Sequence, residues 1–240
     1  MEVPKMRVVT INGQNHKGST YHIGRMLAEK LCDGDEIEEI FLPRDFPYFC
    51  TGCSQCFLKS ETLCPHYEAL KPLVEKLDHA QVMIFTTPVY VYHATGSMKA
   101  FLDHFGYRWM IHRPEESMFH KQAVCLSTAA GAGMSKANKD IKDSLDFWGV
   151  AKTYCWGIAV AATNWQSVSE PKRQKIERAV AVLERKIRAH EGRVKPSFKT
   201  KAMFYLFRSF AKRPGWNQAD ADYWKQKGWT DKVRPWNHKN

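Results

Sequence analysis

Residues 7–31, RVVTINGQNHKGSTYHIGRMLAEKL, join an apolar run to an amphipathic stretch through a polar loop. The run Arg7–Asn12 is typical of a buried strand, because apolar and β-branched residues follow one another without a helical period. From Ile23 to Leu31 the apolar residues repeat at the helical period, and we expect Ser19 to be the N-cap of that helix. The stretch therefore predicts a strand, a tight turn and a helix, which is the repeating unit of a parallel α/β sheet.

The same alternation continues along the chain. Four more strands are expected, at Ile37–Leu42, Val82–Thr87, Gln122–Thr128 and Thr153–Ala162. The helical stripes between and after them are expected at Ala69–Leu77 with Pro72 in the first turn, at Met98–Phe105 behind a Ser97 cap, at Ile141–Trp148 before Gly149, and from Pro171 to Ile187. The inner strands are apolar along their length, as strands covered on both faces are. The sequence therefore predicts the α/β class: a doubly wound, five-stranded parallel sheet.

Length and composition favour one sizeable globular domain with an extension. The chain has 240 residues, of which 44% are hydrophobic and 25% charged, both ordinary values for a globular protein. No apolar run is long enough to span a membrane, so a membrane partner is not expected. The start of the chain, Met1–Arg7, lacks the features of a cleaved signal peptide, and we expect a cytoplasmic location.

The composition changes after residue 192. Residues 193–240 contain twelve Lys or Arg, three Asp and ten aromatic residues. We therefore expect a domain at residues 1–192 and an extension at 193–240, with short helices near Ala202–Ala211 and Asp220–Lys227. Interleaved basic and aromatic residues can bind nucleic acid or an anionic membrane surface. We favour an extension that its aromatic residues anchor on the domain or across a dimer, because these residues follow no single helical spacing.

Three loops at the carboxyl ends of the expected strands are candidates for a ligand site, since open parallel sheets bind ligands there. The first loop offers amide, hydroxyl and backbone N–H groups at a helix N-terminus, which suits a phosphate. Its spacing approaches that of a P-loop, but Ser19 replaces the lysine that contacts a triphosphate, and the dinucleotide fingerprint is missing. A single terminal phosphate is the better ligand. An ordinary strand-to-helix loop is the alternative.

The second loop, after Thr87, carries Pro88 and two tyrosines and can present polar and aromatic groups to a flat ring. A hydrophobic plug over the end of the sheet is the alternative for this loop. The third loop, after Thr128, is rich in alanine and glycine, which lets a ring approach the backbone.

Together the three loops resemble those of the NAD(P)H-dependent FMN reductase family, which is flavodoxin-like. The most specific part is Thr87-Pro88-Val89-Tyr90 followed by Gly96-Ser97-Met98-Lys99-Ala100-Phe101-Leu102-Asp103-His104, and the resemblance covers roughly residues 6–190. The chain departs from the family pattern at Gln14, where serine is common, and at His104, where arginine is common.

The resemblance implies one bound FMN and an NAD(P)H-dependent reaction. The flavin carries the chemistry of that reaction, and no side chain is expected to act as an acid or base. The implied cofactor-binding residues are Gln14, Asn15, His16, Lys17, Gly18, Ser19, Thr20, Pro88, Val89, Tyr90, Val91, Thr128, Ala129, Ala130 and Gly131. Tyr90, Tyr92 and His93 are expected to pack rather than to catalyse. The expected partners are NAD(P)H as electron donor, a small-molecule or protein acceptor, and a second copy in a homodimer.

Four cysteines, Cys50, Cys53, Cys56 and Cys64, lie on the loop after the second strand, which we expect to open toward the flavin. Their compact spacing, with Pro65 after the last, resembles the cysteine motif of iron–sulfur flavoproteins and suits a 4Fe–4S cube. A zinc site and a set of free thiols are the alternatives. Cys32, Cys125 and Cys155 are interpreted as small buried hydrophobes.

Three functions follow from these features. The preferred one is an FMN-dependent NAD(P)H oxidoreductase that reduces a small acceptor such as a flavin or quinone. The second is an iron–sulfur flavoprotein that carries electrons between proteins. The third, of another class, is a non-catalytic protein that binds nucleic acid through its basic extension.

Overall fold

A computed structural model of the chain describes residues 6–32 and 37–237. Five parallel strands form one sheet in the order β2-β1-β3-β4-β5. Their bounds are β1 (Val8–Asn12), β2 (Ile37–Phe41), β3 (Val82–Pro88), β4 (Gln122–Ala129) and β5 (Lys152–Ala159). The predicted doubly wound, flavodoxin-like sheet is therefore confirmed.

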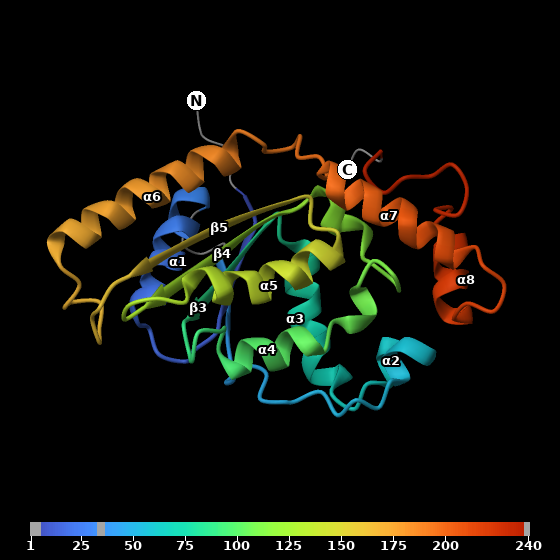
Figure 1. Ribbon diagram of the computed structural model, residues 1–240, viewed down its shortest axis with the longest axis horizontal. Coiled ribbons are helices and arrows are strands. Elements are labelled where there is room, and N and C mark those ends of the chain that lie inside the picture. The colour runs from blue at the N-terminus through green and yellow to red at the C-terminus, as the bar shows by residue number, and fades with distance from the viewer. Residues whose placement is uncertain (1–5, 33–36, 238–240) are drawn as a thin grey trace.

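Helices cover both faces of the sheet (Figure 1). One face carries α1 (Ser19–Leu31) and α6 (Glu170–Arg188), and the other carries α3 (Tyr67–His79), α4 (Gly96–Asp103) and α5 (Met134–Trp148). Short helical turns connect these elements: α2 (Gln55–Leu58), η2 (Glu61–Leu63), η3 (Gly106–Arg108) and η4 (Glu116–His120). The chain ends with α7 (Phe198–Ala211) and α8 (Gln218–Gln226).

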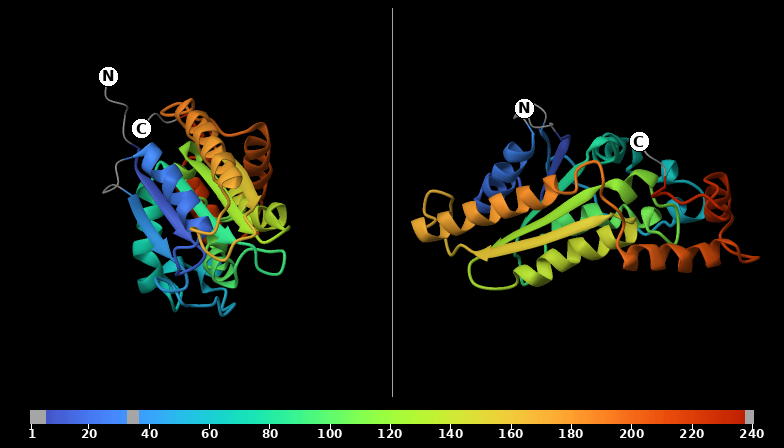
Figure 2. Two further views of the ribbon diagram at one scale, coloured as in Figure 1. Left: turned by 90° about the vertical axis from the view of Figure 1, so that its left-hand side faces the viewer. Right: turned by 90° about the horizontal axis from the view of Figure 1, so that it is seen from above.

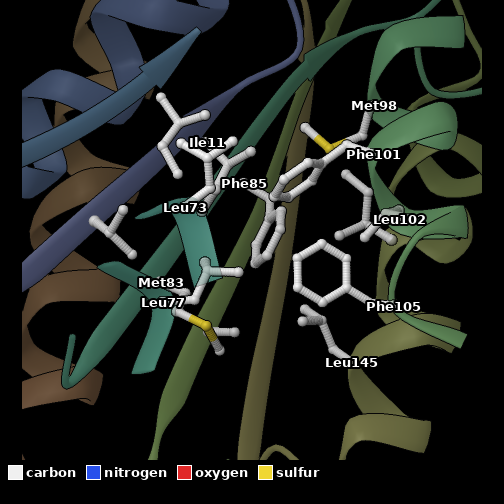
Figure 3. Close-up of a cluster of buried hydrophobic side chains, with 14 of the residues drawn as sticks. Ile11, Leu73, Leu77, Met83, Phe85, Met98, Phe101, Leu102, Phe105 and Leu145 are labelled. Atoms are coloured by element: carbon white, nitrogen blue, oxygen red, sulfur yellow. The ribbon is translucent and has the colours of Figure 1, made fainter. Parts of the chain in front are cut away.

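Alternate strand residues supply the two main hydrophobic cores. Ile11, Met83 and Phe85 point toward α3, α4 and α5, where Figure 3 shows them packed against residues such as Phe101 and Phe105. The intervening strand positions face α1 and α6 instead. Burial of apolar side chains on both faces is the main stabilising term of such a sheet, and it fixes where the strands end relative to one another.

Several boundaries differ from the sequence predictions. Gly18, not Ser19, is the N-cap of α1, and Thr95, not Ser97, caps α4 through its side chain. Pro72 lies inside α3 rather than in its first turn, because that helix begins earlier than predicted, at Tyr67. β5 ends at Ala159, before the predicted Ala162, because Ala161 adopts a positive φ of 49° that a strand does not accommodate.

The exposure of Cys155 also differs from the prediction, since the sequence predicted a buried side chain there. Cys32 and Cys125 are buried as predicted, but Cys155 is exposed. The reason is the strand order: β5 is at the edge of the sheet, which the sequence alone does not state.

The extension packs on the domain at the end of the sheet opposite the strand tips (Figure 2). Its residues Phe204, Trp224 and Trp229 are fully buried against Met110 and Phe119 of the domain. These aromatic side chains are therefore not free to stack on nucleic-acid bases. Within residues 6–32 and 37–237, no helix combines the length and the apolar character that crossing a membrane requires.

Candidate functional site

A cleft of about 210 Å³ lies at the carboxyl ends of β1, β3 and β4. The order of the strands reverses between β1 and β3, and open parallel sheets bind ligands at the carboxyl ends of the strands near such a point. The residues that line it are Asn12, Gly13, Gln14, His16, Gly18, Ser19, Thr20, Tyr21, Thr86, Pro88, Val89, Tyr90, Thr128, Ala129, Ala130, Val160, Ala162 and Thr163.

The N-terminus of α1 opens into this cleft. Gly18 caps the helix without a side-chain hydrogen bond, and the first turn contains no acidic residue. The backbone N–H groups of a first helical turn lack partners within the helix, and the helix dipole is positive there. Ser19 and Thr20 add hydroxyl groups, and the Oγ1 atom of Thr20 lies 2.5 Å from that of Thr128. The arrangement suits a dianionic phosphate.

The first loop is held in place by α4. Thr95 and Ser97 both donate hydrogen bonds to the carbonyl of Gly13, at 2.9 and 3.0 Å. A Cβ atom at Gly13 would lie 2.8 Å from Thr95 Oγ1 and 3.1 Å from the backbone oxygen of Thr86. The loop therefore approaches β3 more closely than any side chain at this position allows.

The second loop forms a tight turn at Tyr90–His93. Tyr90 and His93 exchange backbone hydrogen bonds of 2.9 and 3.0 Å, and the two residues between them, Val91 and Tyr92, have φ values of 49° and 68°. Such values are costly for a β-branched and an aromatic residue. The turn is fixed by His93, whose ring lies 3.1 Å from Asp140 on α5. Tyr90, Val91 and Tyr92 are exposed, so the loop is not the alternative hydrophobic plug.

Two further contacts join the three loops. Gln14 donates a hydrogen bond of 2.7 Å to the hydroxyl of Tyr90, and Val89 N–H donates one of 2.8 Å to the carbonyl of Thr128. The polar loop after β1, the tyrosine loop after β3 and the small-residue loop after β4 therefore form one continuous wall around the cleft.

Eleven of the predicted cofactor-binding residues line the cleft, and four do not. Of the four, Asn15 accepts a hydrogen bond from Arg44 N–H, and the Lys17 ammonium lies 5.2 Å from the Tyr21 ring centroid. Val91 is 93% exposed at the turn, and Gly131 has open space around it. The assignment of these residues to a cofactor remains a prediction.

The sequence analysis missed the loop after β5, which adds Val160, Ala162 and Thr163 to the cleft. The first turns of α6 hold this loop: Lys172 donates to the carbonyl of Val160 at 2.6 Å, and Arg173 donates to three carbonyls of residues 165–168. The available signal was the position of the loop at the carboxyl end of a fifth strand.

The residues of the cleft fit FMN. An uncapped helix N-terminus with neighbouring hydroxyls suits its single phosphate, and small side chains at Ala129 and Ala130 leave room for a flat ring beside Tyr90. The absence of a lysine at position 19 and of a dinucleotide fingerprint argues against a nucleoside triphosphate or FAD pyrophosphate on this loop.

The four clustered cysteines share one neighbourhood. Burial raises the pKa of the Cys56 thiol, and the nearby thiols of Cys64, Cys50 and Cys53 raise it further. Cys56 and Cys64 are half-buried, whereas Cys50 and Cys53 are exposed. Four thiols on one loop fit the donor set of a 4Fe–4S cube, which takes one thiolate per iron.

The sequence predicted that this loop opens toward the cleft, and that prediction is wrong. After β2 the chain runs away from the strand tips, and α2 packs against α8 and η3 (Figure 1). The helix α4 lies between the cleft and the cysteine loop. Thr95 at its start contacts Gly13 of the cleft, and His104 after its end contacts His66 of the cysteine loop. Eight helical residues span roughly 12 Å.

Arg113 and Asp220 brace the cysteine loop against the extension. The Arg113 guanidinium donates to the carbonyls of Cys56 and Phe57 and also pairs with the fully buried carboxylate of Asp220. Asn217, at the N-cap of α8, donates a second hydrogen bond to the Phe57 carbonyl, at 2.9 Å. The backbone of α2 therefore depends on residues more than one hundred positions later in the chain.

Cys64, His66 and His104 form a second donor set, whose ligand atoms all lie within 4.8 Å of one another. His66 Nδ1 is 2.9 Å from His104 Nε2, and His104 Nδ1 is 2.8 Å from the carbonyl of Ala100. These are residue types that bind Zn²⁺. The alternative zinc site therefore has candidate ligands, as the 4Fe–4S cube does. Both sets include Cys64, and one chain cannot fill both at the same time.

Two curated relatives of the chain are named iron–sulfur flavoproteins. An iron–sulfur flavoprotein of Archaeoglobus fulgidus is 24% identical over 230 residues, covering 93% of this chain and 99% of that one. A second iron–sulfur flavoprotein of the same organism is 30% identical over 99 residues, which is 41% of this chain and 48% of that one.

Solved structures share the fold. The apo form of an NADH:FMN oxidoreductase matches with a TM-score of 0.54 and 19% identity, over 80% of this chain and 95% of that one. An FMN-dependent NADH-azoreductase of Bacillus anthracis, solved with FMN, matches with a TM-score of 0.54 and 12% identity, over 74% of this chain and 99% of that one. The model of the family described as NADPH-dependent FMN reductase matches residues 6–163, which include β1 to β5 and all of the loops around the cleft. The chain therefore belongs to the NADPH-dependent FMN reductase family.

Proposed function

We propose that the cleft at the strand tips binds one FMN, with the phosphate on the N-terminus of α1 and the ring between the tyrosine loop and the small-residue loop. When bound, FMN supplies the electron and hydride chemistry of an NAD(P)H oxidoreductase. The observation that carries the site is the uncapped first turn of α1, with no acidic residue and with the hydroxyls of Ser19 and Thr20 facing the cleft. The protein binds and orients the cofactor, and no side chain is assigned as an acid or base.

The identity of the cofactor is the first test. Heat-denatured protein should release FMN, identified by chromatography and mass spectrometry. FAD as the main product would contradict the proposed phosphate site, because that site is one helix N-terminus and its loop lacks the dinucleotide fingerprint.

Replacing both Ser19 and Thr20 with alanine tests the location of the phosphate. A hydrogen bond to a charged group contributes about 1.5–3 kcal/mol, so FMN affinity should fall by that amount for each bond lost. Fluorescence quenching of titrated FMN measures the effect. Ser209→Ala, on the exposed side of the last turn of α7, is the control. Unchanged affinity in the double variant would place the phosphate elsewhere.

The acceptor and the assembly are also part of the proposal. The open cleft suits a small acceptor such as a flavin or quinone, and the exposed tips of Tyr90, Val91 and Tyr92 favour a homodimer in which a second copy covers them. Light scattering after size exclusion should give twice the chain mass. Residues 1–192 are proposed as the flavin domain and 193–240 as an extension that belongs to the same folded unit.

A second candidate function is an iron–sulfur flavoprotein that passes electrons between proteins. Two observations favour it: the relative of that name covers nearly the whole chain, and the thiols of Cys50, Cys53, Cys56 and Cys64 lie in one neighbourhood. The residues would hold a 4Fe–4S cube, which supplies single-electron transfer when bound.

Metal analysis of anaerobically purified protein distinguishes the candidates. With a cube, iron and sulfide should be present in wild type and mostly lost in Cys53→Ala, while FMN content stays the same. Cys155→Ala is the control, because that thiol is also exposed but lies on β5. Zinc without sulfide, lost in His104→Ala and retained in Cys53→Ala, would favour the Cys64–His66–His104 site instead. No metal in either protein would leave a simple FMN reductase.

A further inference from the structure

Cys125 and Cys155 are direct neighbours on adjacent parallel strands. The register of β4 and β5 pairs Cys125 with Cys155, and both side chains lie on the face of the sheet that carries α5. The two thiols are close enough for each to shift the pKa of the other. They differ in access: Cys125 is completely buried, whereas Cys155 is exposed on the edge strand.

The surroundings make the two thiols chemically unequal. The neighbouring Cys125 thiol lowers the pKa of Cys155. Burial and Asp146 raise it and Lys142 on α5 lowers it, and the net shift is downward. Burial raises the pKa of Cys125 well above its ordinary value, so this residue keeps its proton. An accessible thiol with a lowered pKa is the kind that reacts with oxidants, and a neighbouring protonated thiol is the kind that resolves the product.

The strand spacing permits a bond between the two sulfurs. Neighbouring strands lie about 4.7–4.9 Å apart. Disulfides join residues whose Cα atoms are about 4.4–6.8 Å apart. A paired position between adjacent strands therefore meets the Cα criterion for a disulfide. Strained or exposed disulfides are readily reduced again, which is the behaviour of regulatory bonds rather than structural ones.

We propose that Cys155 and Cys125 form a reversible dithiol site at which a hydroperoxide is reduced and a disulfide between β4 and β5 is made. In the first step the Cys155 sulfur attacks the distal oxygen of the hydroperoxide. The O–O bond breaks, the thiol proton leaves with the alcohol or water formed from the other oxygen, and Cys155 becomes a sulfenic acid.

In the second step the Cys125 sulfur attacks that of Cys155. The S–S bond forms, the S–O bond breaks, and the Cys125 proton leaves with the hydroxyl group as water. The two thiols lose two electrons and two protons in total, and the hydroperoxide becomes an alcohol and water. A small dithiol reductant restores both thiols by exchange. The site needs neither FMN nor metal, and so it is independent of the proposed function.

Peptide mapping tests the proposal on the full-length protein as purified. The protein is treated with a stoichiometric amount of hydrogen peroxide, alkylated under denaturing conditions and cut with trypsin. Residues 122–136 and 153–172 are then separate peptides with one cysteine each, and residues 45–59 carry Cys50, Cys53 and Cys56. The expected product joins the first two peptides through a disulfide that dithiothreitol removes.

Two variants define the roles. In Cys125→Ala, Cys155 should stop at the sulfenic acid and be trapped by dimedone, whereas wild type traps little. In Cys155→Ser, Cys125 should remain a free thiol that alkylates fully after unfolding. Circular dichroism of both variants checks that they are folded. The proposal is overturned if Cys155 of peroxide-treated wild type remains alkylatable, or if it joins any cysteine other than Cys125 of its own chain.

Discussion

Gly13 illustrates how one residue sets the geometry of the cleft at the strand tips. Its backbone carbonyl accepts hydrogen bonds from Thr95 and Ser97, and its missing side chain lets β1 and the start of α4 approach. The family resemblance identified this loop from residues 13–20, but the close contact depends on a residue more than eighty positions away. The sequence therefore predicts the loop and not the reason for its glycine.

Gly13→Ala should lower both stability and FMN affinity. Its Cβ would lie 2.8 Å from Thr95 Oγ1 and 3.1 Å from a backbone oxygen, and overpacking of this kind costs about 1–3 kcal/mol. Urea unfolding and FMN titration measure the two effects. Gly96→Ala is the matched control, because a Cβ at Gly96 meets nothing within 4 Å. Equal stability of the two variants would contradict the close contact.

Asp146 gives a residue-scale prediction for pH. Burial alone would raise its pKa, but the hydrogen bonds from Lys142 and Lys199 outweigh burial and lower it. A carboxylate with a lowered pKa in the folded state contributes stability above its unfolded pKa of about 3.9, and the contribution is lost as the pH falls through the folded value. Asp146→Asn should therefore be destabilising at neutral pH, by about 0.5–1 kcal/mol for these partly exposed pairs, and less destabilising at pH 3.

Urea unfolding at both pH values measures that difference. Asp143→Asn is the control, since Asp143 pairs with Lys139 one turn earlier on α5, and both side chains are exposed. Lys199 belongs to α7, so the Asp146 variant should also loosen the extension. A pH-independent effect would mean that packing rather than charge explains the loss.

At the scale of elements, α8 determines the conformation of α2. Asp220 is fully buried and pairs with Arg113, which in turn holds the carbonyls of Cys56 and Phe57. Removing one partner of a buried ion pair costs about 3–5 kcal/mol, because the other charge remains buried without compensation.

Asp220→Asn should therefore destabilise the protein by roughly that amount and free the cysteine loop. Hydrogen exchange of residues 55–58 and the rate at which Cys56 is alkylated should both rise. Asp222→Asn, on the exposed side of the same helix, is the control and should change neither. If the exchange of α2 is unaltered in Asp220→Asn, the extension does not brace the loop.

Strands and helices with a clear period were predictable from the sequence, and their interruptions were not. The pattern located all five strands, and the αL residue Gly149 after α5 was also predicted correctly. The end of β5 was predicted too late because Ala161 turns with a positive φ, which alanine gives no reason to expect. For the same reason the cleft residues of the following loop were missed, whereas loops with sequence motifs were found.

For the whole molecule, the last fifth of the chain is part of the hydrophobic core. Phe204, Trp224 and Trp229 are buried against Met110 and Phe119, in a segment of the domain for which the sequence predicted no element. The composition located the extension and its aromatic anchoring, but it gave no information on the surface that receives them. That surface depends on η4 and on the chain after α4, which have no regular period.

Ending the chain at Gly192 should therefore expose Met110 and Phe119 and lower both solubility and melting temperature. Burial of apolar surface contributes about 25 cal/mol per Å², and several aromatic side chains are removed together. Thermal unfolding and sedimentation measure the outcome. A chain that ends at Asn237 is the control, because every residue of the buried cluster is retained. A soluble Gly192 truncation with unchanged melting temperature would show that the extension is detachable.

The bracing of α2 by α8 has a consequence for biosynthesis. Asn217 bonds to Phe57 across 160 positions of sequence. A ribosome adding about 5–20 residues per second needs roughly 10–30 s to make that interval. During this time the nascent chain carries four thiols on a loop that lacks the support of α8. The loop therefore reaches its final conformation only after α8 has been synthesised.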